Sequence, residues 1–154
     1  MNDTKIMNDT KKLTRLQKQF IDWLKKMECH PKLEKQEMYS FEYNDMDFLL
    51  FVESGTIIAT LTIYLPVEKD KQQTLLEWAV ASVPKEIVSD CSYDCFSNHL
   101  AYINLLFYPS SFGKPILRRD VVQYLKQLTD AYHAVMFKVL LYSGKLGTLD
   151  FNFE

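Results

Sequence analysis

The sequence has 154 residues, a formal net charge of −2, 47% hydrophobic residues and 14% aromatic residues. A chain of this length makes one domain by size and buries about 68–70% of its unfolded surface, so its core needs neither a disulfide nor a metal. The composition excludes disorder over most of the chain, and the balanced charge argues against a nucleic-acid-binding protein, which usually has a basic face.

The chain begins with a polar repeat, in which Met1–Lys5 recurs as Met7–Lys11. This stretch is too polar to pack, so we predict a disordered leader over residues 1–11 and a single α+β domain over residues 12–143. The first helix is expected over Lys12–Met27 and ends before Pro31, which pushes the preceding residue out of the helical region. Its apolar residues recur at steps of three and four: Leu13, Leu16, Phe20, Leu24 and Met27.

Three strand-like runs follow the first helix. Tyr39–Tyr43 alternates apolar and polar residues, Met46–Val52 is almost entirely apolar, and Asn44–Asp45 between them is a turn pair. Thr56–Leu65 alternates throughout and places five apolar residues on one face: Ile57, Ala59, Leu61, Ile63 and Leu65. The short turns between these runs predict an antiparallel meander.

A short helix and two further strands are expected next. Asp70 and Gln73 have capping-box spacing at the start of the helix, and Pro84 ends it. Cys91–Phe96 predicts a weak strand, whereas Ala101–Phe107 alternates clearly and predicts a strong one.

A long helix is predicted from Pro115, a residue suited to the first helical position, and a tail of uncertain structure follows over residues 144–154. The main apolar stripe of this helix comprises Leu117, Val121, Tyr124, Leu125, Leu128, Tyr132, Val135 and Val139. Beyond Ala134, Phe137, Leu140 and Leu141 fall on the opposite side. Either the tail, which contains Phe151 and Phe153, or another molecule is expected to cover this second side.

The cysteine, histidine and carboxylate residues are the candidates for metal binding or catalysis. The nearest approach to a metal cluster is Cys91, Cys95 and His99, but residues four apart on a strand lie ~13 Å from each other, and no CxxC pair is present. Cys95 has no sequence-linked base or oxyanion turn that would make it a nucleophile, and His99 or His133 could reach it only through tertiary contact. We therefore expect no metal.

The carboxylate pairs Asp45/Asp47 and Asp90/Asp94 lie in polar turns, where bonds to their own backbone are expected. The chain has four glycines and contains no phosphate-binding glycine motif. We expect no catalytic residue and no cofactor.

The cysteines and the apolar segments indicate the cellular compartment of the protein. The polar and charged stretch Met1–Gln17 lacks the apolar core of a secretory signal, and the uncharged stretch Cys95–Gly113 is interrupted by residues that a membrane span rarely carries. Three cysteines without framework spacing suit a reducing compartment. We expect a cytoplasmic protein without a membrane partner.

The order of one helix, three strands, one helix, two strands and a long helix resembles the type III secretion chaperone-like fold, a group that includes bacterial YbjN-type regulators. The resemblance covers roughly Leu16–Leu141, and its best local matches are the Phe41–Phe48 hairpin and the helix after Tyr108. It implies a small acidic protein, commonly dimeric, without catalytic residues, that binds an extended segment of another protein on the first helix and the sheet. The polar stretch Cys91–Asn98 departs from this pattern.

These observations predict one antiparallel sheet with the element order α-βββ-α-ββ-α and with the N- and C-terminal helices packed on one face. The predicted function is non-enzymatic protein binding by a chaperone-like or regulatory homodimer. The residues expected to contact a protein client or a second copy are Trp23, Phe137, Leu140 and Leu141.

The alternative is a sensor of a small anion or metabolite at the start of the last helix, where free N–H groups favour negative charge. Its residues are Ser110, Ser111, Lys114, Arg118 and Arg119.

Overall fold

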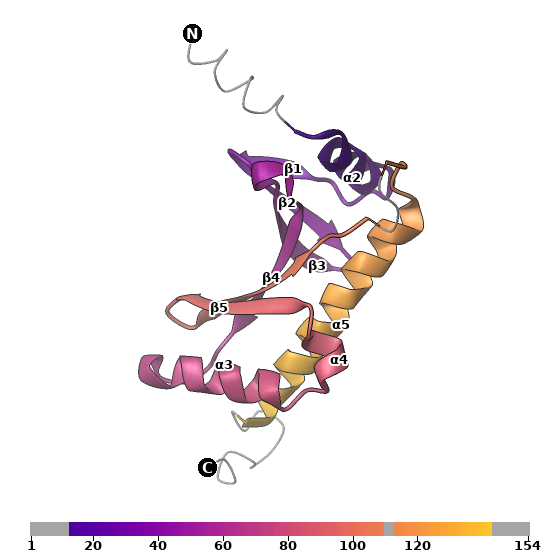
Figure 1. The fold of residues 1–154 in the computed structure, drawn as a ribbon. Helices are drawn as coiled ribbons and strands as arrows, with labels where there is room; N and C mark the ends of the chain where they lie inside the picture. Colours follow the sequence, from indigo (N-terminus) through magenta and orange to yellow (C-terminus); the bar gives the residue numbers. More distant parts are fainter. Residues whose placement is uncertain (1–12, 110–112, 143–154) are drawn as a thin grey trace. The chain divides into compact units, whose positions relative to one another are not determined.

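The computed structural model of the protein describes residues 13–109 and 113–142, so the predicted leader and tail lie outside the described residues. In chain order, the elements are α2 (Arg15–Lys26), β1 (Lys32–Lys35), β2 (Met38–Tyr43), β3 (Met46–Phe51), β4 (Ile58–Tyr64), α3 (Gln72–Ala81), α4 (Lys85–Val88), β5 (Cys91–Ser97), β6 (Leu100–Leu106) and α5 (Arg118–Tyr142). Short 3₁₀ turns cover Glu53–Gly55 and Lys69–Lys71. The predicted α+β class is confirmed, with helices near both ends of the described chain (Figure 1).

The six strands form one antiparallel sheet in the order β1-β2-β3-β4-β6-β5. The three runs predicted before the short helix are β2, β3 and β4. Asn44 and Asp45 have φ values of 51° and 61°, the left-handed conformation that a tight hairpin between twisted strands requires. The structure adds one strand that the sequence pattern did not indicate. All four residues of β1 are exposed and three are charged, so β1 carries no apolar alternation.

Helix α2 begins with the side chain of Thr14. Thr14 Oγ1 accepts a hydrogen bond from the backbone N–H of Gln17 at 3.1 Å, and Gln17 Oε1 accepts one from the backbone N–H of Thr14 at 2.9 Å. This reciprocal pair satisfies two N–H groups that a helix start leaves unpaired. The predicted apolar stripe is buried at Phe20 and Leu24, and the helix ends at Lys26, close to the predicted position.

The described chain divides into two compact units. The first unit runs up to Thr60 and adds Leu106–Leu125, and the second comprises Leu61–Leu105 and the chain from Lys126. Strands β4 and β6 and helix α5 each pass from one unit into the other. The single domain predicted over residues 12–143 stays a prediction.

The core of the first unit is aromatic. The ring of Phe20 on α2 lies 5.2 Å from that of Phe107 and 5.7 Å from that of Tyr124, in edge-to-face geometry. Such contacts stabilise a core beyond the apolar area that they bury. The Tyr124 hydroxyl accepts a hydrogen bond from the backbone N–H of Ala59 at 2.7 Å, so the polar end of this buried side chain is also satisfied.

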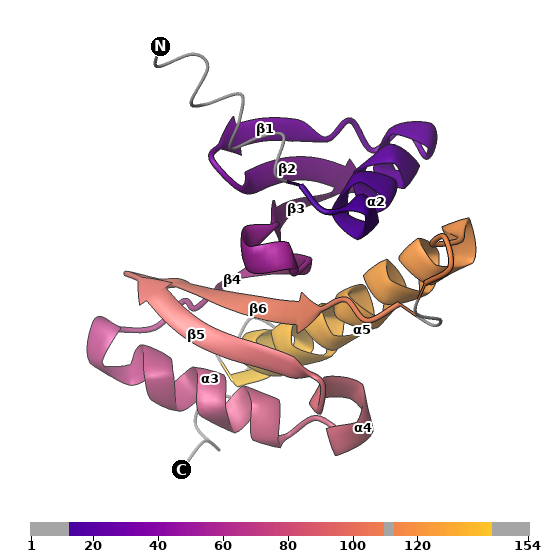
Figure 2. The same cartoon turned by 45° about the horizontal axis from the view of Figure 1, so that its top comes forward.

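The second unit holds α3, α4 and the β5–β6 hairpin (Figure 2). Helix α3 buries Leu75, Leu76 and Ala79, and the second half of α5 buries Ala131, Val135 and Val139. The capping box predicted for α3 is wrong. Its N-cap is Lys71, which makes no side-chain cap, and the Gln73 amide instead donates to Glu77 at 3.0 Å.

Candidate functional site

The last turns of α5 carry the apolar surface that the sequence predicted. Val135 and Val139 are buried on one side of the helix, while Phe137 on the other side is 54% exposed. Leu140 and Leu141 are half-buried and follow Phe137 at the helical steps of three and four, so the three side chains share one side of α5. We call these three residues the helix patch. Phe151 and Phe153, the expected intramolecular cover, lie outside the described residues.

Trp23, the fourth predicted partner-binding residue, belongs to the first unit, whereas the helix patch belongs to the second. Its indole N–H donates to the carbonyl of Ile116 at 2.8 Å, and the Lys26 ammonium lies 4.8 Å from the ring centroid. The polar atom of this half-buried side chain is therefore used within its own unit. Contact between a partner and the carbon atoms of the Trp23 ring stays a prediction.

The cations predicted to bind an anion are exposed at Lys114, Arg118 and Arg119, and Ser110 and Ser111 lie outside the described residues. A carboxylate of the chain already meets the helix start, because Asp120 Oδ2 accepts from the backbone N–H of Leu117 at 2.9 Å. This bond satisfies one of the N–H groups that would otherwise attract an anion. The anion site stays a prediction.

The cysteines of β5 have the properties of structural thiols. Burial raises the pKa of the Cys91 thiol to about 11, and it also raises the pKa of Cys95. Because the thiolate is the reactive form, both groups are poor nucleophiles near neutral pH. Asp94 precedes Cys95 on the strand and therefore points to the opposite face of the sheet, so the two cannot act as one catalytic group. Within residues 13–109 and 113–142, no three His, Cys, Asp or Glu side chains are placed to hold a metal ion.

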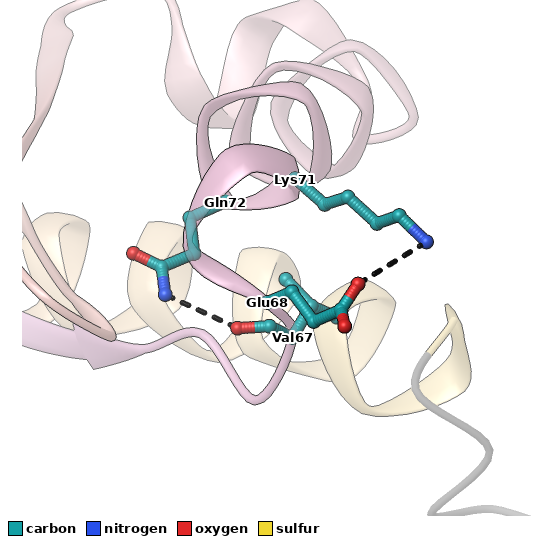
Figure 3. Close-up of polar contacts among 4 residues, drawn as sticks. All are labelled: Val67, Glu68, Lys71 and Gln72. Carbon is teal, nitrogen blue, oxygen red and sulfur yellow. Dashed lines mark hydrogen bonds and ion pairs between the residues drawn. The ribbon is translucent and has the colours of Figure 1, made fainter.

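A buried amide that the sequence analysis missed fastens the β5–β6 hairpin. Gln72, which is only 4% exposed, accepts a hydrogen bond from the backbone N–H of His99 at 3.0 Å. Its amide nitrogen lies 3.1 Å from the Val67 carbonyl (Figure 3) and 3.2 Å from Asn98 Oδ1, and donates to both. His99 Nδ1 lies 3.0 Å from the carbonyl of Leu65, so the ring proton belongs on Nδ1, which donates to that oxygen.

An open hollow of about 680 Å³ adjoins this corner and is lined by Tyr64, Pro66, Val67, Glu68, Lys69, Asn98 and His99. At its edge Glu68 forms an ion pair with Lys71, with 3.7 Å between Oε1 and Nζ (Figure 3). Both side chains are largely exposed, so this pair contributes little to stability. The lining combines the rings of Tyr64 and His99 with the carboxylate of Glu68 and the ammonium of Lys69.

Aromatic side chains also gather on the outer face of the second unit. The rings of Phe96 and Tyr102 stack with centroids 3.8 Å apart, although Phe96 is 44% exposed. Tyr64, more than half exposed, lies 5.8 Å from the ring of His99. The sequence pattern gave little sign of this arrangement, because Phe96 stands in a polar run and meets Tyr102 only through the pairing of β5 with β6.

Comparison with known proteins bears on the fold. No family model matches the chain, and no curated protein matches its sequence. The structure is similar to the crystal structure of YbjN from E. coli, a proposed transcription regulator, with 11% sequence identity, a TM-score of 0.49, and coverage of 82% of this chain and 90% of that chain. YbjN is the type of regulator that the resemblance drawn from the sequence named. No helix in the described part of the chain is long and apolar enough to cross a membrane.

Proposed function

We propose that this protein is a non-enzymatic protein-binding module, chaperone-like or regulatory, that acts as a homodimer and binds a partner protein through the helix patch. The single observation that carries the proposal is the exposure of Phe137 beside Leu140 and Leu141, on the side of α5 opposite the buried Val135 and Val139. A helix that faces its own core on one side has no internal need for apolar residues on the other.

The size of the effect follows from the exposed area. Phe137 leaves 54% of its surface in contact with solvent. For a side chain that can bury 150–250 Å², about 100 Å² remains available to a partner, which at ~25 cal/mol per Å² corresponds to roughly 2.5 kcal/mol of gross binding free energy. Ordering and orientation costs offset much of this term, so the half-buried leucines must contribute as well.

The β5 thiols support binding rather than chemistry. Burial raises the pKa of both Cys91 and Cys95, and the nearby carboxylates of Asp94 and Glu77 raise that of Cys95 further. Nucleophilic catalysis requires the reverse, a lowered pKa or an adjacent base. Recognition of a partner requires only shape and apolar area, which the second unit offers.

Two measurements test the proposal on the full chain. Light scattering of the purified protein is expected to report twice the chain mass, and a single-chain mass at all concentrations would refute the homodimer. For partner binding, the wild-type chain is used to capture proteins from a lysate of the source cells, beside Phe137→Asp and the matched control Leu117→Asp.

Leu117 is an exposed apolar residue of the first unit, which makes it a suitable control. We expect one protein to be retained by the wild type and by Leu117→Asp and lost with Phe137→Asp. The free energy of unfolding of Phe137→Asp should fall by no more than about 2 kcal/mol, because the buried part of the side chain amounts to roughly 90 Å² at ~25 cal/mol per Å². Equal retention of every captured protein by Phe137→Asp and the wild type would contradict the role of the helix patch.

A further inference from the structure

Strand β5 is the last strand of the sheet, and β6 is its only strand neighbour in the described part of the chain (Figure 2). The strand at the other edge, β1, is protected against pairing with other chains by Lys32, Lys35 and a bulge. Strand β5 has no lysine, arginine or proline, and the nearest basic residues along the chain are Lys85 and Lys114. Strand β5 carries one charged residue, Asp94, and a bulge only at its far end, between Cys95 and Ser97, so its segment from Cys91 to Cys95 is a regular edge with less protection than β1.

The hydrogen bonds between β4 and β6 determine which backbone groups of β5 point outward. At one end of this pair the Leu65 N–H donates to the His99 carbonyl at 2.8 Å, and at the other the Phe107 N–H donates to the Ile57 carbonyl at 2.9 Å. Odd-numbered residues of β6 thus direct their backbone groups toward β4, and the even-numbered residues direct theirs toward β5.

The register of the β5–β6 hairpin determines which residues of β5 direct their backbone groups toward β6. Ser92 pairs with Asn104 and Asp94 with Tyr102, so these even-numbered residues bond inward to β6. Cys91, Tyr93 and Cys95 therefore direct their N–H and C=O groups to the open edge. No hydrogen bond to these outward groups occurs from any described residue.

We propose that the occupant of this edge is a second copy of the chain, whose β5 pairs antiparallel with the first so that Tyr93 faces Tyr93 of the second copy across a two-fold axis. The inference rests on the proposed function in that it takes the protein to be a homodimer. The two copies contact each other through β5. The helix patch on α5 then stays available for the partner protein.

The register follows from the three outward residues. With Tyr93 on the axis, Cys91 lies opposite Cys95 of the second copy, and all three residues of each strand exchange both of their hydrogen bonds. A shift of one residue to either side of the axis leaves one of the three residues unpaired. The centred register therefore satisfies the largest number of backbone groups, six in each strand.

The charges on β5 select the same register. With Tyr93 on the axis, Asp94 lies opposite Ser92 of the second copy, and a hydroxyl is a suitable donor to a carboxylate. If the axis moves to Asp94, the two aspartates lie directly opposite each other, where like charges destabilise strand pairing. The exposed carboxylate of Asp94 thus excludes the neighbouring register on one side.

The first test compares Cys95→Pro with Cys95→Ala by light scattering of the full chain. Both variants lose the thiol, but only proline lacks the outward N–H, and proline is tolerated at an edge when that N–H faces away from the ladder. Each dimer of the proline variant loses two interchain hydrogen bonds, so we expect its dissociation constant to rise roughly 10- to 100-fold while the alanine variant stays dimeric. A proline variant that is folded and as dimeric as Cys95→Ala would overturn the proposal.

The second test measures the register of the β5–β5 contact by disulfide formation. It does not depend on the folding of the proline variant. Residues in a hydrogen-bonded antiparallel pair have Cα atoms about 5.5 Å apart, within the range of a disulfide. In a Cys29→Ala background, Cys91→Ser and Cys95→Ser are oxidised with diamide at about pH 9, separately and mixed. Diamide takes up two electrons and two protons as each sulfur–sulfur bond forms.

We expect a covalent dimer in the mixture, where Cys95 of one copy faces Cys91 of the other, and none in either variant alone. A covalent dimer in Cys91→Ser alone, or none in the mixture, would overturn the proposed register. The failure of this inference is distinct from the failure of the proposed function. A wild-type dimer that is unaffected by Cys95→Pro refutes the β5 contact only, whereas a wild-type chain that is always single refutes the homodimer itself.

Discussion

Replacing Gln72 with leucine should loosen the corner that holds the β5–β6 hairpin. The amide accepts from the His99 N–H at 3.0 Å and donates to Val67 at 3.1 Å and Asn98 at 3.2 Å, and the side chain is almost fully buried. Leucine has a similar size but cannot replace these bonds, so the His99 N–H and the Val67 carbonyl lose a partner. With three bonds of about 0.5–1.5 kcal/mol each, the free energy of unfolding should fall by roughly 2–4 kcal/mol.

For a chain of this length each kcal/mol lowers Tm by about 2–4 °C, so Gln72→Leu should melt roughly 5–15 °C below the wild type. Thermal unfolding followed by circular dichroism measures this difference. The matched control is Gln73→Leu on the same helix, because Gln73 is exposed and bonds only to Glu77. Its free energy of unfolding should change by no more than about 0.5 kcal/mol. Equal melting temperatures for the two variants would refute the assignment of Gln72 as the residue that fastens the hairpin.

Three further predictions concern other contacts. Trp23→Phe removes the indole N–H that donates to Ile116 and should cost about 1–2 kcal/mol in urea unfolding; an unchanged midpoint would show that this bond contributes nothing. Thr14→Ala breaks the reciprocal cap with Gln17 and should cost about 1 kcal/mol by the same assay, whereas Thr14→Ser should retain most of the stability. Burial raises the pKa of Cys91 from 9.0 to about 11, so the stability linked to its protonated thiol is present below pH 9 and is lost as pH rises to about 11. Because the thiol is partly open to solvent, about 1–2 kcal/mol should be lost, and urea unfolding at both pH values should show a smaller loss in Cys91→Ala.

The parts of the fold that follow from local periodicity were predicted well. The alternation over Thr56–Leu65 predicted that Ile57, Ala59, Leu61, Ile63 and Leu65 share a face, and all five are buried. The steps of three and four in the first helix predicted Phe20 and Leu24 on the buried face of α2, which also includes Gln17 and Ile21. In both cases a side chain's direction depends only on its position in a regular backbone, so the sequence is sufficient.

Contacts between distant segments were not predicted. Strand β1 has no apolar alternation and exists because β2 offers it an unpaired edge. Glutamine is usually exposed on a helix, so nothing in the sequence indicated that Gln72 belongs to the core. Its amide is buried because the turn at Asn98 and His99 folds back onto it. The weak strand predicted at Cys91–Phe96 is a full strand, since its polar residues pair with the strongly alternating β6.

The candidate site divides in the same way. The sequence by itself determined that Phe137, Leu140 and Leu141 lie opposite the core side of a long helix, since the helical repeat alone fixes that angle. Only the tertiary structure decided that β5 is the edge of the sheet and that Cys91, Tyr93 and Cys95 direct their backbone groups outward. The direction of a strand's hydrogen bonds depends on which strand it pairs with, and that neighbour can lie far away in the sequence, so the local side-chain pattern does not determine it.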